Sequence, residues 1–346
     1  MRGFDRTRST GTIDGRTCRE IRLRGQPETR LGRDTRQSVK VPEAVKKASG
    51  PSGVLVGGAF AALCLTWGLA FIVFHVGLTT APPLTYATCR AFLAGLSIAG
   101  WLVLTGHALP RDRATHTTAL VCGALNVAGF WGLQNMSLRF VPPAETAILV
   151  YIQPLLTAFG AWLWLGEGLS PVKLLGLLAG VGGVIAVVGA QLSLAPGAPI
   201  LGLFCALGGG ISWASGTVFF KSRPARQSLL WIVALQALYG SVPLAVSAIL
   251  LERPTISFGF TFVWTIAYAS VASSALAYVL WFWLLRQRAA SEVAAFIFLV
   301  PLVATIGDSL LLGDHFGLGT LAGGLLIVLG IGLVNRPTRK KPLASS

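Results

Sequence analysis

Residues 151–168 read YIQPLLTAFGAWLWLGEG, and residues 298–315 read FLVPLVATIGDSLLLGDH. The second stretch repeats a proline, two glycines and an acidic residue of the first after 147 residues. This single shift, without a gap, relates nine pairs of residues: Arg139 and Arg286, Glu145 and Glu292, Ala147 and Ala294, Pro154 and Pro301, Gly160 and Gly307, Gly166 and Gly313, Glu167 and Asp314, Gly176 and Gly323, and Gly183 and Gly330. An internal repeat of this length indicates that two similar units make up the chain.

The composition is that of a membrane protein. Of 346 residues, 53% are hydrophobic and 12% are charged, whereas soluble proteins carry about 25% charged residues. The mean hydropathy is +0.69. From about Val54 onward, apolar runs follow one another, each of about the 20 residues that a helix needs to cross a bilayer. Because backbone groups in lipid must bond internally, we expect helices, and hence an all-α integral membrane protein.

We predict ten membrane-spanning helices joined by short connections. Ser170 followed by Pro171 is typical of a helix start, and Pro142-Pro143 and Ser291 mark two more. The predicted ranges are 54–75, 83–104, 115–136, 142–165, 171–190, 199–220, 228–250, 260–285, 291–312 and 317–335.

The repeat and the span count together predict the topology. The shift maps spans 3, 4 and 5 onto spans 8, 9 and 10, so each repeat, 54–190 and 199–335, holds five spans. The first spans agree at a shift of 146, which matches Trp67 with Trp213. Since five is odd, the second repeat is inverted relative to the first. Inverted repeats characterise secondary transporters, whose substrate site lies between the repeats near the membrane midplane.

The net charge of +15 lies mostly outside the predicted spans. Residues 1–52 hold thirteen Lys and Arg against six Asp and Glu, a net charge of +7, without apolar periodicity or an aromatic platform. They predict a disordered, basic cytoplasmic tail at the membrane surface rather than a signal peptide or a nucleic-acid-binding segment. Whether residues 1–40 belong to the native protein is an open question, because Met136 is the next methionine after Met1.

Positive charges also predict the orientation. With the N-terminus inside, the inner loops and a second basic tail, 336–346, hold twelve Lys and Arg, and the outer loops hold two. This bias places both termini in the cytoplasm.

The chain resembles the EamA family of the drug/metabolite transporter superfamily over residues 54–335. The motifs that carry the resemblance are Trp67-Gly68, Pro154, Leu165-Gly166-Glu167-Gly168-Leu169, Gly176 to Gly183, Trp213, Pro301, Leu312-Gly313-Asp314, and Gly323 to Gly330. The resemblance implies ten helices in two inverted five-helix halves that move small metabolites across a bacterial inner membrane. Asp314 stands where the family more often has Glu.

Two charged residues fall inside predicted spans, where a charge costs at least ~2.5–3.5 kcal/mol. Arg90 lies about seven residues into span 2, and Asp308 about five residues from the outer end of span 9. Because the repeat matches Asp308 with Ala161, the scaffold does not require this carboxylate. We expect the two to form a gate or to hold a charged cargo, with Asp308 as a carrier of a coupling proton. The alternative is a static pair that orders the bundle.

Further candidates for substrate binding or gating come from matched and polar positions. Glu145 and Glu292 fall in the first turns of their helices. Each either is an acid stabilised by the positive helix end or stands at the mouth of a transport pathway. Pro154 and Pro301 predict mid-helix kinks, which either line the cavity or serve packing. Polar and aromatic residues of spans 3, 4 and 8 complete the set: Asn126, Gln134, Asn135, Tyr151, Gln153, Tyr278 and Trp281.

Two other matched features favour structural roles. The glycines of spans 5 and 10, including Gly176-x-x-x-Gly180 and Gly319-x-x-x-Gly323, predict close helix packing rather than dimerisation. Glu167 and Asp314 predict helix-boundary or capping roles, with gating as the second interpretation.

The sequence predicts a secondary transporter rather than an enzyme. It contains no Walker motif, no His-Glu-x-x-His and no cluster of His or Cys, so we expect no metal and no cofactor. We predict alternating-access transport of small polar metabolites or amino acids, with export favoured by the resemblance and with either a proton gradient or the cargo gradient as the energy source. The partners are a small molecule, the lipid bilayer and a proton; the oligomeric state is left open. The alternatives are a membrane-embedded lipid- or isoprenoid-modifying enzyme and a membrane partner protein without transport.

Overall fold

The computed structural model of the protein describes residues 51–141, 143–189, 200–224, 226–312 and 318–336. Within these ranges, side chains are described except at residues 71, 143–145 and 308–312. The described residues form helices and no β-strand. The two predicted tails lie almost wholly outside the described residues.

Both halves consist of helices whose limits agree with the predicted spans to within two residues. The first half comprises α1 (Gly53–Gly77), α2 (Pro83–Leu104), α3 (Arg113–Cys122), the π-helix η1 (Gly123–Gly129), α4 (Phe130–Ser137), α5 (Pro143–Val150), α6 (Gln153–Leu165) and α7 (Pro171–Val188). The second comprises α8 (Ile200–Lys221), α9 (Leu229–Leu251), α10 (Phe260–Ala267), the π-helix η3 (Tyr268–Leu276), α11 (Ala277–Gln287), α12 (Ala290–Ala295), the 3-10 helix η4 (Phe296–Phe298), α13 (Leu299–Leu312) and α14 (Leu318–Val334).

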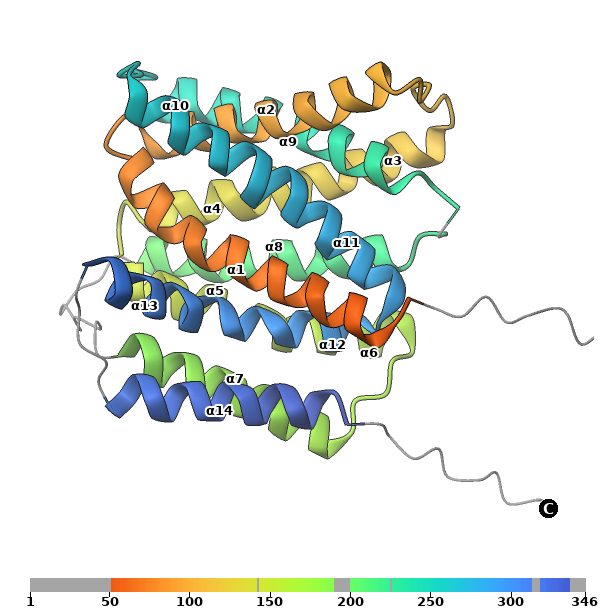
Figure 1. Cartoon of the computed structure of the whole chain (residues 1–346), viewed down its shortest axis with the longest axis vertical. Helices are drawn as coiled ribbons and strands as arrows, with labels where there is room; N and C mark the ends of the chain where they lie inside the picture. The colour runs from red at the N-terminus through yellow and green to blue at the C-terminus, as the bar shows by residue number, and fades with distance from the viewer. Residues whose placement is uncertain (1–50, 142, 190–199, 225, 313–317, 337–346) are drawn as a thin grey trace, which may run out of the picture. The chain divides into compact units, whose positions relative to one another are not determined.

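The helices are long and apolar enough for a membrane protein. In the described part of the chain, eight helical stretches could cross a membrane by length and composition, and α14 is a shorter apolar helix. The continuous stretch α3–η1–α4 accounts for predicted span 3. The count of ten crossings therefore stays a prediction. In Figure 1, α1 begins and α14 ends at the same end of the helical unit, as an even number of crossings requires.

Packing between the halves follows the repeat. Helix α2 packs on its counterpart α9, and α7 packs on its counterpart α14. The contact of α1 with α13 is mirrored by that of α8 with α6, and the contact of α8 with α4 by that of α1 with α11. These reciprocal pairs confirm the two-repeat architecture, with the two halves related by a pseudo-twofold axis.

Glycines bring α7 and α14 together along a line that we name the glycine seam: Gly176, Gly183, Gly323 and Gly330. A Cβ added to Gly176 would lie 2.7 Å from the carbonyl oxygen of Gly330, and one added to Gly183 would lie 2.7 Å from that of Gly323. Backbone therefore touches backbone across the seam. The predicted close helix packing is confirmed, and it occurs within the chain.

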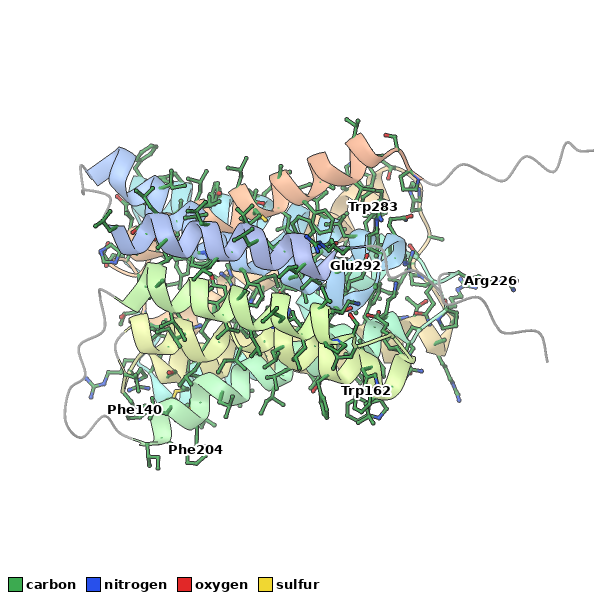
Figure 2. All side chains as sticks on the ribbon, turned by 90° about the horizontal axis from the view of Figure 1, so that it is seen from below. Phe140, Trp162, Phe204, Arg226, Trp283 and Glu292 are labelled. Atoms are coloured by element: carbon green, nitrogen blue, oxygen red, sulfur yellow. The ribbon has the colours of Figure 1, made fainter. Side chains whose placement is uncertain are left out.

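The outer surface of the helical unit carries large apolar side chains. Trp162 and Phe204 are 47% and 64% exposed and project away from the helices in Figure 2. Soluble proteins rarely expose contiguous apolar surface of this kind. Because hydrocarbon solvates such side chains, the surface suits a bilayer.

Candidate functional site

Both copies of the fourth span are interrupted beside a proline. Helix α5 ends at Val150. Helix α6 begins at Gln153 and has Pro154 at its second position. In the second half, η4 separates α12 from α13, whose third residue is Pro301. Because proline has no N–H and its ring clashes one turn back, the carbonyls of Val150 and Ile297 lose their usual helical donors. The sequence predicted a kinked but continuous helix at each proline. The structure instead has a break between α5 and α6, and a 3-10 segment between α12 and α13, at positions that the repeat matches.

The third span of each half contains a π-helix at an equivalent place. Segment η1 covers Gly123–Gly129, and the residues 147 positions later, 270–276, all lie in η3. The carbonyl of Asn126 in η1 accepts a hydrogen bond from the Tyr278 hydroxyl at 3.1 Å. At the matched place in η3, the carbonyl of Ser273 accepts one from Trp67 Nε1 at 3.0 Å. Short π-helical segments inside α-helices are frequent at functional sites, and the carbonyls of these two accept hydrogen bonds from aromatic side chains of a cavity wall.

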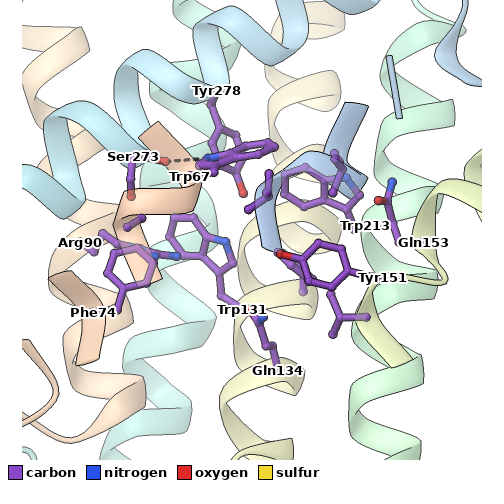
Figure 3. A pocket seen from close by; sticks show the side chains of 15 residues that line it. Trp67, Phe74, Arg90, Trp131, Gln134, Tyr151, Gln153, Trp213, Ser273 and Tyr278 are labelled. Atoms are coloured by element: carbon purple, nitrogen blue, oxygen red, sulfur yellow. Dashed lines mark hydrogen bonds between the residues drawn. The ribbon is translucent and has the colours of Figure 1, made fainter. Parts of the chain in front are cut away.

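A cavity of about 130 Å³ lies between the halves (Figure 3). It is lined by Trp67, Ala70, Phe74, Arg90, Phe130, Trp131, Gln134, Val150, Tyr151, Gln153, Trp213, Ser273, Tyr278, Ile297 and Val300. Eight of these form four pairs that the repeat matches: Trp67 with Trp213, Trp131 with Tyr278, Val150 with Ile297, and Gln153 with Val300. The cavity therefore lies on the pseudo-twofold axis, where the interrupted spans of both halves meet.

Arg90, the eighth residue of α2, brings a charge to this apolar site. The side chain is 9% exposed, and its guanidinium lies 3.5 Å from the centre of the Trp131 ring and 4.5 Å from that of Phe74. Figure 3 shows the three side chains together at one side of the cavity. Cation–π contacts of this kind are stronger when they are shielded from water. Arg90 Nε has no hydrogen-bond partner among the described residues.

The structure brings five of the sequence-predicted residues together around the cavity: Arg90, Gln134, Tyr151, Gln153 and Tyr278. Gln153 also donates a hydrogen bond from Nε2 to the Thr157 hydroxyl at 2.8 Å, which orients its amide.

Three predicted polar or aromatic residues lie outside the cavity lining. The side chain of Asn126 is fully buried and packs against Gly216, where an added Cβ would collide with it. Asn135 donates a hydrogen bond from Nδ2 to the Trp131 carbonyl one turn earlier, at 2.8 Å. Trp281 is fully buried behind the wall. These residues pack the bundle and support the cavity from outside.

The predicted acidic residues have different outcomes. Glu292 lies in the first turn of α12, as predicted, and is partly buried there, away from the cavity lining. Asp308 belongs to α13 and Glu145 to α5, but their side chains lie outside the described part of the structure. The predicted pairing of Arg90 with Asp308 therefore stays a prediction.

Aromatic residues on α1 and α8 were not in the predicted site. Trp67 and Trp213 lie with ring centroids 5.6 Å apart, and each also contacts Trp281 at 5.7 and 5.6 Å. This cluster supports the cavity wall, to which Trp67 and Trp213 themselves contribute. Their match in the repeat at a shift of 146 was the signal that could have placed them at the axis.

Glu167 caps a helix of the opposite half, as its predicted boundary role suggested. Its Oε1 accepts from the backbone N–H of Ala290 at 2.6 Å, and its Oε2 accepts from the hydroxyl and backbone N–H of Ser291 at 2.6 and 3.2 Å. Ser291, predicted as the start of the span, is not the cap of α12. The helix begins at Ala290, after Ala289, and Glu167 supplies the acceptor that alanine lacks.

A second carboxylate makes the same contact elsewhere. Glu252 follows α9 and accepts from the backbone N–H groups of Leu84 and Thr85 in α2, both at 2.9 Å, and from the Thr85 hydroxyl at 3.0 Å. Helix α2 begins at Pro83 without a cap of its own. The sequence analysis did not single out Glu252, because a glutamate after a helix shows no sign of its distant partner.

Comparison with known proteins agrees with this architecture. The family model described as "EamA-like transporter family" matches residues 54–189 and again residues 200–336. The chain belongs to this family. It is a multi-pass membrane protein, and the family name points to a transporter rather than an enzyme.

Relatives of the family extend the comparison. The transporter YvbV of Bacillus subtilis is 34% identical over 284 residues, which cover 82% of this chain and 92% of the relative. A Salmonella typhimurium protein named "Probable amino-acid metabolite efflux pump" is 28% identical, covering 77% and 90%. The inner membrane transporter YedA of Escherichia coli is 29% identical, covering 79% and 87%. A crystal structure with a TM-score of 0.73 and 19% identity covers 82% of this chain and 97% of its own, and shows the fold alone.

Proposed function

We propose that this membrane transporter is a secondary active carrier that exports small polar metabolites or amino acids across the bacterial inner membrane by alternating access. The observation that supports the proposal is the cavity on the pseudo-twofold axis, walled by matched residues of both halves. A site placed on such an axis can open to either side when one half rocks against the other. The name of the Salmonella relative supports export and an amino-acid metabolite as cargo.

The orientation belongs to the same proposal. Both termini face the cytoplasm, which the excess of Lys and Arg in the inner loops supports. Accessibility tagging of each chain end in intact cells tests this arrangement, and a terminus that is labelled from outside would contradict it.

Counterflow in proteoliposomes tests the transport step. Purified full-length protein is reconstituted with one unlabelled metabolite inside, and uptake of its labelled form is followed for a panel of amino acids and their derivatives. Accumulation above that in protein-free liposomes is the expected result. Absence of exchange across the whole panel would refute a carrier of these substrates.

We further propose that transport is coupled to protons through Asp308, the acidic residue within α13. Net uphill transport driven by an imposed pH gradient should be abolished in Asp308→Asn, provided that the folded variant is recovered in equal amount. Asp112→Asn, which changes a carboxylate in the loop before α3, is the matched control. Full pH-driven transport by the Asp308 variant would exclude the proposed role.

A further inference from the structure

The side chain of a buried arginine, Arg90, lines the cavity. The Arg90 guanidinium lies over the rings of Trp131 and Phe74, with its central carbon 3.5 and 4.5 Å from the ring centres. A guanidinium bonds carboxylates through its in-plane N–H groups, and its faces stack on aromatic rings. Ring contacts use none of the N–H donors of Arg90, and its Nε, which is buried, has no hydrogen-bond partner among the described residues. A buried donor without a partner is costly, which favours a ligand that supplies the acceptor.

The remaining wall limits the charge and character of that ligand. Among the described lining residues, Arg90 is the one that carries a charge, and the polar side chains are those of Gln134, Gln153, Ser273 and two tyrosines. Five aromatic side chains make up most of the rest: Trp67, Phe74, Phe130, Trp131 and Trp213. One fixed positive charge in an apolar surround compensates a single negative charge. It leaves a dianion half compensated and repels a cation.

The volume limits the size. A cavity needs about 10–15 Å³ of this kind of space for each water molecule. The 130 Å³ here therefore hold roughly ten groups of that size. A compact molecule with about that number of non-hydrogen atoms fits, and a nucleotide or a lipid does not.

We propose that Arg90 is the specificity-determining residue for cargo, and that it binds the carboxylate of a small organic monoacid whose apolar or aromatic body lies on the aromatic wall. The assignment rests on the proposed transport function, and it narrows the cargo to carboxylates with an apolar body. It gives Arg90 the role of an anion receptor. The bidentate guanidinium–carboxylate contact orients the molecule, and the rings exclude water around it.

A pair of isosteric probes tests this assignment. 3-Phenylpropionate carries a carboxylate, and 3-phenylpropionamide has the same shape without charge. Binding of each to the purified full-length chain is followed by tryptophan fluorescence, because Trp67, Trp131 and Trp213 line the cavity. We expect the wild-type chain to bind the acid at least tenfold more tightly than the amide. Arg90→Gln should bind both probes equally, and Arg253→Gln, which removes an exposed arginine outside the cavity, should keep the wild-type preference.

Two results would overturn the assignment. Equal binding of acid and amide by the wild-type chain would mean that the guanidinium charge is already neutralised within the protein. An acid preference retained by Arg90→Gln would place the anion receptor elsewhere. If Arg90→Gln does not fold, Arg90→Lys replaces it. Lysine keeps the charge but lacks the planar fork, so the acid preference should shrink severalfold, and an unchanged preference would refute a bidentate receptor.

Counterflow of labelled 3-phenylpropionate with the same preparation separates the two proposals. Charge-selective binding without any exchange would refute the transport function for this acid and would support Arg90 as a receptor. Exchange that is equally fast for acid and amide would support a carrier and would overturn the role of Arg90.

Discussion

Replacing Glu167 by glutamine tests whether this carboxylate holds the two halves together at the end where α1 begins and α12 starts. The carboxylate accepts three hydrogen bonds from Ala290 and Ser291, at 2.6, 2.6 and 3.2 Å. Glutamine keeps one acceptor oxygen and presents an NH₂ group in place of the other. That group cannot accept from the Ser291 N–H. The Ser291 hydroxyl also receives a hydrogen bond from Lys173 at 2.8 Å, which restricts its rearrangement.

The size of the effect follows from the bonds that change. A hydrogen bond to a charged group contributes about 1.5–3 kcal/mol. The substitution removes at least one such bond and makes the others neutral. Because Glu167 is only partly buried, we expect the lower part of the range, about 2 kcal/mol for opening of the α12 N-terminus. At 1.4 kcal/mol for each factor of ten, this corresponds to roughly 30-fold more frequent opening.

Hydrogen exchange measured by mass spectrometry on the full-length protein reads this opening directly. The amides of Ala290 and Ser291 should exchange roughly 30-fold faster in the glutamine variant. Glu252→Gln is the matched control, since it changes the equivalent contact and should speed exchange at Leu84 and Thr85 alone. Unchanged exchange at the start of α12 in the first variant would refute the view that the carboxylate holds this end.

Two further predictions concern the glycine seam and a loop. In a thermal-unfolding assay, Gly183→Ala should lower the free energy of unfolding by about 1–3 kcal/mol, because the added Cβ meets the α14 backbone. Gly182→Ala, where the added Cβ has open space, should have no effect. Equal effects of the two substitutions would contradict close packing along the glycine seam. Hydrogen bonds from the Thr115 side chain and N–H lower the pKa of the exposed Asp112 carboxyl that caps α3. The cap therefore stabilises α3 above the ordinary pKa of 3.8 and weakens as pH falls below it. Exchange of the Thr115 amide, corrected for its intrinsic pH dependence, should accelerate in that range, and a constant rate would contradict the cap.

Much of the fold was readable because the signals are local or periodic. Apolar length fixed the spans to within two residues, and proline chemistry placed both interruptions of the fourth spans. Arg90 was found because a charge in an apolar run is costly wherever it points. Tyr151 and Gln153 were found as an aromatic and a polar residue within an apolar span, and both line the cavity.

The features that were missed depend on contacts between distant residues. The carbonyl of Asn126 in the π-helix η1 accepts a hydrogen bond from the hydroxyl of Tyr278, which lies 152 residues away in the sequence. Nothing in the local sequence of η1 reports that donor. In the same way, the sequence around Glu252 does not indicate that its carboxylate accepts hydrogen bonds from Leu84 and Thr85 at the start of α2.

The two π-helices imply that the cavity belongs to neither half alone. Tyr278 is supplied by the second half and tethered to a carbonyl of the first, while Trp67 is supplied by the first half and tethered to a carbonyl of the second. Each half thus steadies a ring that the other contributes. A half expressed by itself would leave one carbonyl without its donor and one ring without its anchor. A substitution that distorts either π-helix would consequently also displace the aromatic side chain that the other half contributes to the cavity wall.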